Sequence, residues 1–287
     1  MNILVTGAKG ILGARLVAYL ATQGFAVTGL NSRALDVTDY GAAVRVIGAA
    51  HPDLVIHCAA LTRVDYAAEH PAEALRVNGY GAHNVALACA QSGAALAFIS
   101  SNEVFDGSSP RPYLEYDRTA PANPYGYSKW YAEEAIQRIL PQHYIIRTSW
   151  LFAHGGSNFL QKILMRAGAG EALHVVTDEV AAPTYGEDLV VAICALIQTQ
   201  RYGIYHLVNE GSASRYAFAR AALDAAGYAH FSIEGITHEQ FPRPSRPPRD
   251  STLANFAAAA LGIRLRPWQH AVEAFIEAER AASTARP

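Results

Sequence analysis

A glycine-rich turn near the N-terminus constrains the fold of this chain more than any other sequence feature. Residues 2–6 form a short apolar segment with β-branched side chains. The segment leads into a turn that holds Gly7, Gly10 and Gly13, and residues 14–20 then have a helical pattern. In a strand, turn and helix of this kind, the glycines let a pyrophosphate approach the backbone and the free N–H groups at the helix start. The sequence therefore predicts a dinucleotide-binding unit.

Strand and helix patterns alternate along the first half of the chain. Such alternation predicts a parallel sheet covered by helices on both faces, and right-handed crossovers then give the doubly wound form. Ligands bind at the carboxyl ends of the strands in such a sheet. We expect strands at residues 2–6, 26–30, 54–60, 97–101 and 144–147, and helices at 36–50, 72–92 and from about Tyr125.

The pattern becomes less regular beyond residue 151. Short strand candidates lie at 173–176 and 205–208, and a Pro- and Arg-rich segment, at 241–249, is either part of a binding lobe or a stiff linker. The predicted fold is therefore an α/β, Rossmann-type doubly wound parallel sheet with a smaller C-terminal substrate-binding lobe. Residues 1–150 are expected to form the NAD(P)-binding domain. Residues 151–287 are expected to form mainly the lobe, with some elements returning to the first domain.

Tyr125 and Lys129 lie four residues apart, just after a helix-start signal at residues 121–124. On a helix, positions i and i+4 lie on one face, so the ammonium can lie beside the phenol. A neighbouring cation favours the phenolate, so we expect Lys129 to lower the pKa of Tyr125 from about 10 and to make it a usable proton donor. The same spacing also occurs on ordinary surface helices.

The three residues after the second predicted strand are Asn31, Ser32 and Arg33. An acidic residue at this place accepts a hydrogen bond from the adenosine ribose, whereas an arginine accommodates a 2′-phosphate. Arg33 therefore favours NADPH as the cofactor, and NADH remains possible. The alternative is that Arg33 is a solvated loop charge.

The composition indicates a globular protein that acts on small molecules. Of 287 residues, 51% are hydrophobic, and 23 Lys and Arg against 25 Asp and Glu give a net charge of −2 without blocks of like charge. We therefore expect no nucleic-acid partner and no membrane partner. Cys58, Cys89 and Cys194 lie in apolar segments, which is typical of reduced core thiols. With no signal peptide and no long apolar run, the cytoplasm is the expected location.

Short motifs are spread over nearly the whole chain, at residues 7–13, 58–65, 69, 78, 100–107, 125–129, 147–150, 182–184, 205–207 and 248–253. Together they resemble the extended short-chain dehydrogenase/reductase superfamily, and more closely the dTDP-4-dehydrorhamnose reductase family. The resemblance implies that the chain is an NAD(P)H-dependent oxidoreductase. The resemblance implies that the substrate is a 6-deoxyhexose linked to a nucleotide, dTDP, and that its 4-keto group is reduced.

The resemblance also implies roles for individual residues. Tyr125 would protonate the sugar alkoxide, and Lys129 would hydrogen-bond the nicotinamide ribose. Ser101 would donate to the same sugar oxygen, so the expected catalytic residues are Ser101, Tyr125 and Lys129. The expected cofactor-binding residues are Gly7, Lys9, Gly10, Ile11, Leu12, Gly13, Asn31, Ser32, Arg33, Asp36, Val37, Cys58, Ala59, Ala60, Thr62, Tyr125 and Lys129. The expected substrate-binding residues are Thr62, Val64, Asp65, Ser101, Asn102, Glu103 and Trp150.

One departure from the family pattern is Glu103, where the reductases commonly carry an aromatic residue. Nucleotide-sugar 4,6-dehydratases resemble this segment but have an aspartic acid where this chain has Asn102, and an amide cannot protonate a leaving hydroxyl. Elimination is therefore disfavoured. Glu103 is left with three interpretations: contact with a substrate hydroxyl, a base in a nucleotide-sugar epimerase, or a solvent-facing side chain.

A non-catalytic alternative also exists, because residues 100–107 resemble the methionine adenosyltransferase regulatory subunit. The chain would then be a cofactor-bound regulator.

A second departure concerns metal. Some bacterial reductases share Mg²⁺ between subunits through acidic side chains, and one such position is Arg15 here, while Glu187 is acidic at another. A cation does not ligate Mg²⁺, so we expect no metal site. A homodimer is possible, on the general ground that many soluble proteins form symmetric oligomers.

Overall fold

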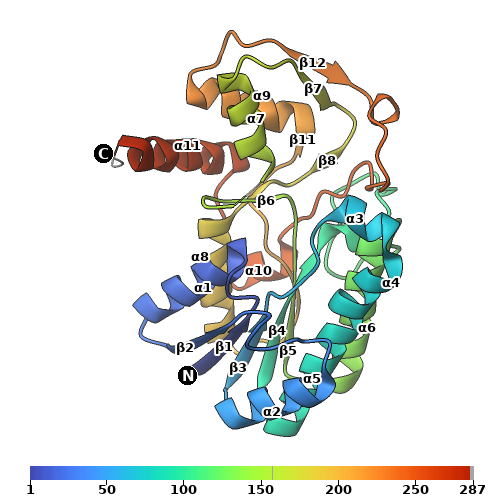
Figure 1. Ribbon diagram of the computed structural model, residues 1–287, viewed down its shortest axis with the longest axis vertical. Coiled ribbons are helices and arrows are strands. Elements are labelled where there is room, and N and C mark those ends of the chain that lie inside the picture. Colours follow the sequence, from blue (N-terminus) through green and yellow to red (C-terminus); the bar gives the residue numbers. More distant parts are fainter. Residues whose placement is uncertain (157, 285–287) are drawn as a thin grey trace.

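A six-stranded parallel sheet forms the centre of the protein in the computed structural model, which describes residues 1–156 and 158–284 (Figure 1). Its strands are β1 (Asn2–Thr6), β2 (Ala26–Leu30), β3 (Leu54–His57), β4 (Ala95–Ser101), β5 (His143–Thr148) and β10 (Gly203–His206). Their order is β10-β5-β4-β3-β1-β2, and every neighbouring pair is parallel. The strand order reverses between β1 and β3, which creates a crevice at their carboxyl ends. The predicted Rossmann-type doubly wound fold is confirmed.

Helices cover both faces of this sheet. Ile3 and Val5 of β1 pack into one core, whereas Leu4 packs into the other, because successive strand side chains point to opposite faces. Burial on both faces is the reason why these strands are apolar throughout. One face is covered by α1 (Ile11–Thr22), α8 (Gly186–Gln198) and α10 (Phe256–Ala260), and the other by α2 (Tyr40–Ala50), α5 (Gly81–Ser92) and α6 (Pro124–Ile139).

A second region lies beyond the carboxyl ends of the sheet, at the top of Figure 1. Phe152, Phe218 and Phe275 pack edge to face in its aromatic core. The chain crosses between the two regions more than once, since β10 belongs to the central sheet and α8 and α10 pack against it. The division at residue 150 stays a prediction. The elements of this second region are β6 (Leu151–Phe152), α7 (Phe159–Gly168), β7 (Leu173–Val176), β8 (Val180–Ala181), β9 (Thr184–Tyr185), β11 (Ala213–Ser214), α9 (Arg215–Ala226), β12 (Ile233–Ile236), the short helix η3 (His238–Gln240) and α11 (Trp268–Thr284).

Three predicted boundaries are wrong. The helix expected from residue 36 begins at Tyr40, because the carboxylate of Asp39 caps it by accepting from the backbone N–H of Ala42. The strand expected at 54–60 ends at His57, and the chain then turns toward the crevice. The helix expected at 72–92 consists of α4 (Pro71–Ala74), a π-helical turn η1 (Leu75–Tyr80) and α5, and it follows α3 (Val64–Glu69).

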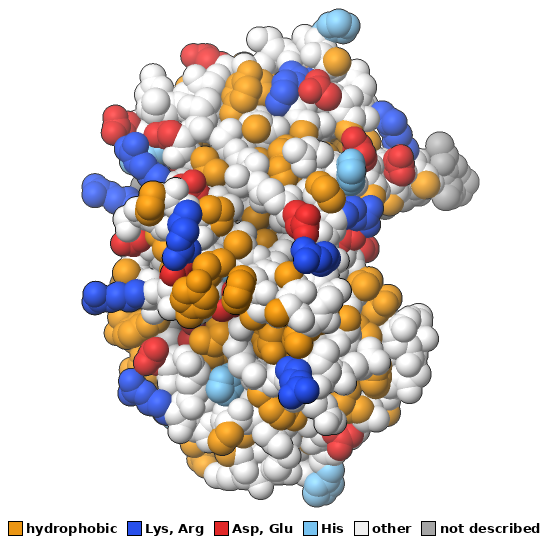
Figure 2. Space-filling model, turned by 180° about the vertical axis from the view of Figure 1, so that it is seen from behind, with side chains coloured by type: hydrophobic (Ala, Val, Ile, Leu, Met, Phe, Trp, Pro, Cys, Tyr) orange, Lys and Arg blue, Asp and Glu red, His pale blue; other side chains and the backbone are white. Residues whose placement is uncertain are grey.

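The surface combines charges of both signs. On the face seen in Figure 2, basic and acidic side chains are interspersed among scattered hydrophobic ones. Within the described part of the chain, no helix combines the length and the apolar character that crossing a membrane would need.

Candidate active site

A cleft of about 440 Å³ lies between the carboxyl ends of the sheet and the second region. It brings together fourteen of the residues predicted from the sequence, and nine predicted residues lie outside its lining. The fourteen are Gly10, Ile11, Leu12, Gly13, Cys58, Ala60, Thr62, Val64, Ser101, Asn102, Glu103, Tyr125, Lys129 and Trp150. The nine are Gly7, Lys9, Asn31, Ser32, Arg33, Asp36, Val37, Ala59 and Asp65.

The glycine turn has the shape that a pyrophosphate site requires. Gly7 has a φ of +66°, and a Cβ placed on it would lie 2.6 Å from the backbone nitrogen of Ala59. A Cβ on Gly13 would overlap the carbonyl oxygen of Gly7, so α1 packs too closely on the turn for a side chain. Gly10 caps α1 without a side-chain hydrogen bond, which leaves backbone N–H groups of the first turn available to an anion.

The residues predicted to meet the adenosine ribose lie at the end of β2. The side-chain oxygen of Asn31 accepts from the backbone N–H groups of Arg33 and Ala34, at 2.9 and 3.2 Å, and so shapes the turn. Arg33 is exposed, and within residues 1–156 and 158–284 it has no ion pair. Its guanidinium is therefore free for a 2′-phosphate.

Asp36 and Val37 make contacts of their own within the protein. Asp36 accepts hydrogen bonds from the backbone and hydroxyl of Thr38, which lower the pKa of its carboxyl. Val37 is buried beside Gly81 in the core under α2 and α5. Their predicted contacts with a cofactor stay predictions.

The predicted catalytic residues come from the ends of two neighbouring elements. Ser101 is the last residue of β4 and precedes the short helix η2 (Asn102–Val104), whereas Tyr125 and Lys129 lie on α6. Pro124 starts α6, and Asn123 caps it by accepting from the backbone N–H of Gly126 at 2.8 Å.

Gly126 is needed for close packing between these two elements. A Cβ on Gly126 would overlap the carbonyl oxygen of Glu103. Any other residue would therefore push α6 away from η2, which directly follows Ser101, and would shift Tyr125 relative to Ser101.

Asn78 fixes the catalytic helix to the loop after β3. Its side-chain oxygen accepts from the backbone N–H of Leu61 at 2.7 Å. Its amide nitrogen donates to the carbonyl of Leu61 at 3.0 Å and to the hydroxyl of Ser128 at 2.9 Å. Asn78 lies in the π-helical turn η1, and such turns are frequent at functional sites.

Comparisons with known proteins agree with this geometry. The family model described as "RmlD substrate binding domain" matches residues 1–281. A dTDP-4-dehydrorhamnose reductase from Streptomyces griseus is 39% identical over 277 residues, which cover 94% of this chain and 91% of that protein. The chain belongs to the dTDP-4-dehydrorhamnose reductase family.

Two solved structures of this reductase family are similar over nearly the whole chain. The dTDP-4-dehydrorhamnose reductase of Clostridium acetobutylicum has a TM-score of 0.93 and 32% identity, and the match covers 98% of this chain and 100% of that one. The enzyme of Bacillus anthracis, in complex with NADP, has a TM-score of 0.91 and 33% identity, with 96% and 99% covered.

The electrostatics of the reductase site differ from the prediction for Tyr125. Burial raises the pKa of Tyr125 well above its ordinary value, the charge of Glu103 raises it further, and a hydrogen bond with Ser101 lowers it. The prediction that Lys129 lowers the pKa of Tyr125 is wrong, because burial and the charge of Glu103 raise this pKa. A phenol with a raised pKa stays protonated at neutral pH, which is the form that donates a proton.

Lys129 is buried, with 3% of its surface exposed. Burial lowers the pKa of its ammonium to about 8, although the nearby carboxylate of Glu133 raises it. Within the described residues its Nζ donates no hydrogen bond to the protein. A buried ammonium without an acceptor needs one from a ligand, and ribose hydroxyls are suitable.

Glu103 is half-buried at the cleft and does not simply face solvent. Its carboxylate accepts from the side chain of Asn123 at 2.6 Å. Burial raises the pKa of the Glu103 carboxyl, whereas the hydrogen bond from Asn123 and the charges of Arg215 and Arg243 lower it. Contact with a substrate hydroxyl and a role as a base remain open.

Asn102 and Asp65 connect the two regions. The amide nitrogen of Asn102 donates to the hydroxyl of Ser251 at 2.6 Å. The carboxylate of Asp65 accepts from Arg243 Nε at 2.8 Å, in the Pro- and Arg-rich segment, so this segment packs against the sheet region. Their predicted contacts with substrate stay predictions.

Trp150 lines the cleft beside Arg215. Its φ of 41° is in the left-handed region, which is rare for a bulky residue and marks a conformation that its surroundings impose. Its ring stacks on Phe218, with centroids 6.3 Å apart, and on the guanidinium of Arg215.

Ten further residues line the cleft. Ser100, Thr148 and Ser149 lie at strand ends within the motifs at 100–107 and 147–150, as the sequence predicts for a crevice at the strand ends. The other seven lie outside those motifs, and only the fold brings them to the cleft. The ten are Ile99, Ser100, Thr148, Ser149, Leu151, Phe152, Asn158, Phe159, Arg215 and Phe218.

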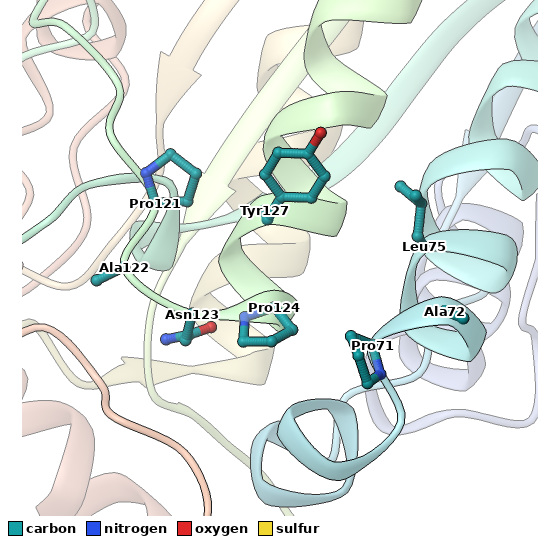
Figure 3. Close-up of a pocket in the computed structure, with 8 residues that line it drawn as sticks. All are labelled: Pro71, Ala72, Leu75, Pro121, Ala122, Asn123, Pro124 and Tyr127. Carbon is teal, nitrogen blue, oxygen red and sulfur yellow. The ribbon is translucent and has the colours of Figure 1, made fainter.

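A second groove, of about 420 Å³, lies beside the start of α6 (Figure 3). Figure 3 shows Tyr127 and the loop at residues 121–124 on one side of it, and Pro71 and Leu75 on the other. Its lining is mainly apolar and contains no carboxylate and no ammonium among the described residues. The groove therefore lacks the groups that the predicted chemistry needs.

Arg15 pairs with Glu187 in this member of the family. Arg15 Nε lies 2.8 Å from Glu187 Oε1, so the guanidinium supplies a positive charge next to that carboxylate. Over residues 1–156 and 158–284, no group of three or more His, Cys, Asp or Glu side chains is arranged to hold a metal ion.

Proposed function

We propose that this protein reduces the 4-keto group of a dTDP-linked 6-deoxyhexose with NADPH. The family relationship supports this assignment, since relatives that match nearly the whole chain carry the name dTDP-4-dehydrorhamnose reductase. The observation that carries the proposal is the cleft itself, which holds Ser101, Tyr125 and Lys129 together with the glycine turn.

The residues of the cleft fit a bound dinucleotide. The glycine turn has no room for side chains, the first turn of α1 has free N–H groups, and Arg33 is exposed where a 2′-phosphate would lie. Lys129 has an ammonium that needs an acceptor, which ribose hydroxyls would supply. When bound, NADPH supplies the hydride that reduces the carbonyl carbon.

Tyr125 and Ser101 then act on the sugar oxygen. As the carbonyl π bond breaks, its electron pair moves to the oxygen, and the Tyr125 phenol transfers its proton there. The Ser101 hydroxyl donates a hydrogen bond to the same oxygen as the charge develops. The phenolate that remains then takes a proton from solvent.

The proposal is tested by mixing the purified protein with NADPH and a dTDP-linked 4-keto-6-deoxyhexose and following the absorbance of NADPH. We expect oxidation of NADPH and, by NMR, a product whose 4-position carries a hydroxyl. With NADPH deuterated at the transferred position, the label should appear on carbon 4 of the sugar. dTDP-glucose, which has no ketone, is the control and should cause no oxidation. Failure with several nucleotide-linked ketosugars would reject the function.

Three lesser proposals accompany the function. A boundary near residue 150 would separate cofactor binding from substrate binding, and limited proteolysis tests it. Three unpaired cysteines suit a reducing compartment such as the cytoplasm, which fractionation of the host cell tests. A homodimer is tested by light scattering of the purified protein.

A further inference from the structure

Arg215 is the first residue of α9, and its side chain lines the cleft. Its guanidinium carbon lies 3.5 Å from the ring centroid of Trp150 and 5.2 Å from that of Phe159. Its ion pair with Glu179 has an Nε–Oε2 distance of 3.8 Å, too long for a hydrogen bond. Within residues 1–156 and 158–284, its guanidinium donates no hydrogen bond to the protein.

The guanidinium has five N–H donors and stays charged. The Arg215 side chain is 24% exposed and lines the cleft, so a ligand there can replace water as the acceptor for these donors. Burial lowers the pKa of Arg215 to about 10, although Glu179 raises it, so the group is still a cation at neutral pH. Stacking on the Trp150 ring fixes the guanidinium plane but satisfies none of its N–H groups.

The neighbouring charges leave Arg215 available to a ligand. Arg243 uses its Nε to bind Asp65 and places its NH1 3.9 Å from Glu179, so it shares that carboxylate with Arg215. Glu103 exerts a weaker electrostatic influence on Arg215 and is itself bonded to Asn123.

Among the described residues that line the cleft, the Lys and Arg side chains are Lys129 and Arg215. Lys129 lies over Phe98 at the catalytic end. An anionic substrate group at the Trp150 end would therefore meet Arg215.

We propose that Arg215 binds the diphosphate of the nucleotide-sugar substrate, while Trp150 holds its guanidinium in position. The inference rests on the proposed function, because it takes the substrate to be a nucleoside diphosphate sugar. A planar guanidinium donates two parallel hydrogen bonds to phosphate oxygens, which the compact ammonium of a lysine does not reproduce. The sugar would then extend from Arg215 along the cleft toward Tyr125 and Ser101.

Calorimetric titration with dTDP and with thymidine, each in the presence of saturating NADPH, tests this proposal without requiring turnover. We expect Arg215→Ala to weaken dTDP binding about 10- to 100-fold, as is typical for a lost charge-assisted hydrogen bond, and to leave thymidine binding unchanged. Arg215→Lys should lie between Arg215→Ala and the wild type. Arg138→Ala is the control, since it removes the same charge from a side chain on α6 that is 79% exposed.

The outcomes separate this inference from the proposed function. Unchanged dTDP binding in both Arg215 variants would overturn the inference, and so would an equal loss of thymidine binding. A wild-type protein that binds dTDP through Arg215 but reduces no dTDP-linked ketone would reject the proposed function alone. Should Arg215→Ala fail to give a cooperative thermal unfolding transition, Arg215→Lys decides the question, because it keeps the charge and the aliphatic stem.

Discussion

The two ends of the cleft are built in different ways. At the catalytic end, Ser101, Tyr125 and Lys129 lie on one strand and one helix, held together by the close contact at Gly126. At the Trp150 end, Phe159 lies on α7, Phe218 and Arg215 lie on α9, and Trp150 lies between β5 and β6. The first arrangement suits chemistry that demands fixed geometry, and the second suits recognition of a ligand by side chains gathered from distant parts of the chain.

This comparison makes a distinction that mutants can test. Changes at the catalytic end should lower kcat, whereas changes at the Trp150 end should mainly raise KM for the nucleotide sugar.

The largest effect is expected for Tyr125→Phe, which removes the proton donor and keeps the ring. We expect kcat to fall by about 10²- to 10⁴-fold, because the alkoxide loses its general acid. NADPH affinity, measured by cofactor fluorescence, should change little. Tyr127→Phe is the matched control: it removes a hydroxyl two residues further along α6, from a side chain that is 46% exposed. Equal losses in the two variants would contradict a special role for Tyr125.

At the other end, Trp150→Ala should raise KM for the nucleotide sugar by about 10- to 100-fold, the usual result of losing an aromatic contact. The value of kcat should fall less, because the Trp150 ring takes no part in the proton transfer. Steady-state kinetics with varied sugar and saturating NADPH measures both. A large loss in kcat with KM unchanged would contradict the expectation that the Trp150 end affects mainly substrate binding.

Arg33→Ala tests the recognition of the cofactor, separately from the catalytic end and the Trp150 end of the cleft. Loss of one phosphate contact should raise KM for NADPH about tenfold and leave KM for NADH nearly unchanged. Kinetics with each cofactor at a fixed sugar concentration provides the measurement. An equal change for both cofactors would mean that Arg33 does not recognise the 2′-phosphate.

Lys129→Met should stabilise the protein in the absence of NADPH by about 1–2 kcal/mol, because a buried ammonium without an acceptor is replaced by an apolar side chain. The pKa of Lys129 is lowered to about 8, so the folded state gives up this proton at a pH where the unfolded chain still holds it. The destabilisation by Lys129 is therefore complete below about pH 8 and declines as the pH rises toward the ordinary pKa.

Urea unfolding of the wild type and of Lys129→Met at several pH values measures this difference. The gap in free energy of unfolding should be constant below about pH 8 and smaller above it. A gap that widens at alkaline pH would contradict the account. The variant should also bind NADPH more weakly, so that stability and function change in opposite directions.

The smallest effect is expected for Glu103→Gln. The amide keeps the size of the side chain and removes a charge that raises the pKa of Tyr125. We expect kcat for reduction to change by less than about tenfold, since the proton donor itself remains. A much larger loss, together with loss of solvent deuterium uptake next to the ketone, would assign Glu103 as a base.

Sequence patterns alone determined the doubly wound sheet and the catalytic end of the cleft. Alternating apolar strands and helices specify the layers, and the residues that follow the parallel strands meet at one edge of the sheet. The turn at Gly7 and the spacing of Tyr125 and Lys129 are local features, so each can be recognised within one short segment of the sequence. The fold class and the residues of this end were predicted for that reason.

Tertiary structure decided the electrostatics and the Trp150 end. Whether Lys129 lies near the Tyr125 hydroxyl or over Phe98 depends on packing between α6 and β4, and burial, which no local spacing encodes, sets the pKa of both groups. Arg215 reaches the cleft only because α9 packs beside Trp150, far from it in sequence. Local periodicity specifies elements, whereas long-range packing specifies which side chains meet and how much water surrounds them.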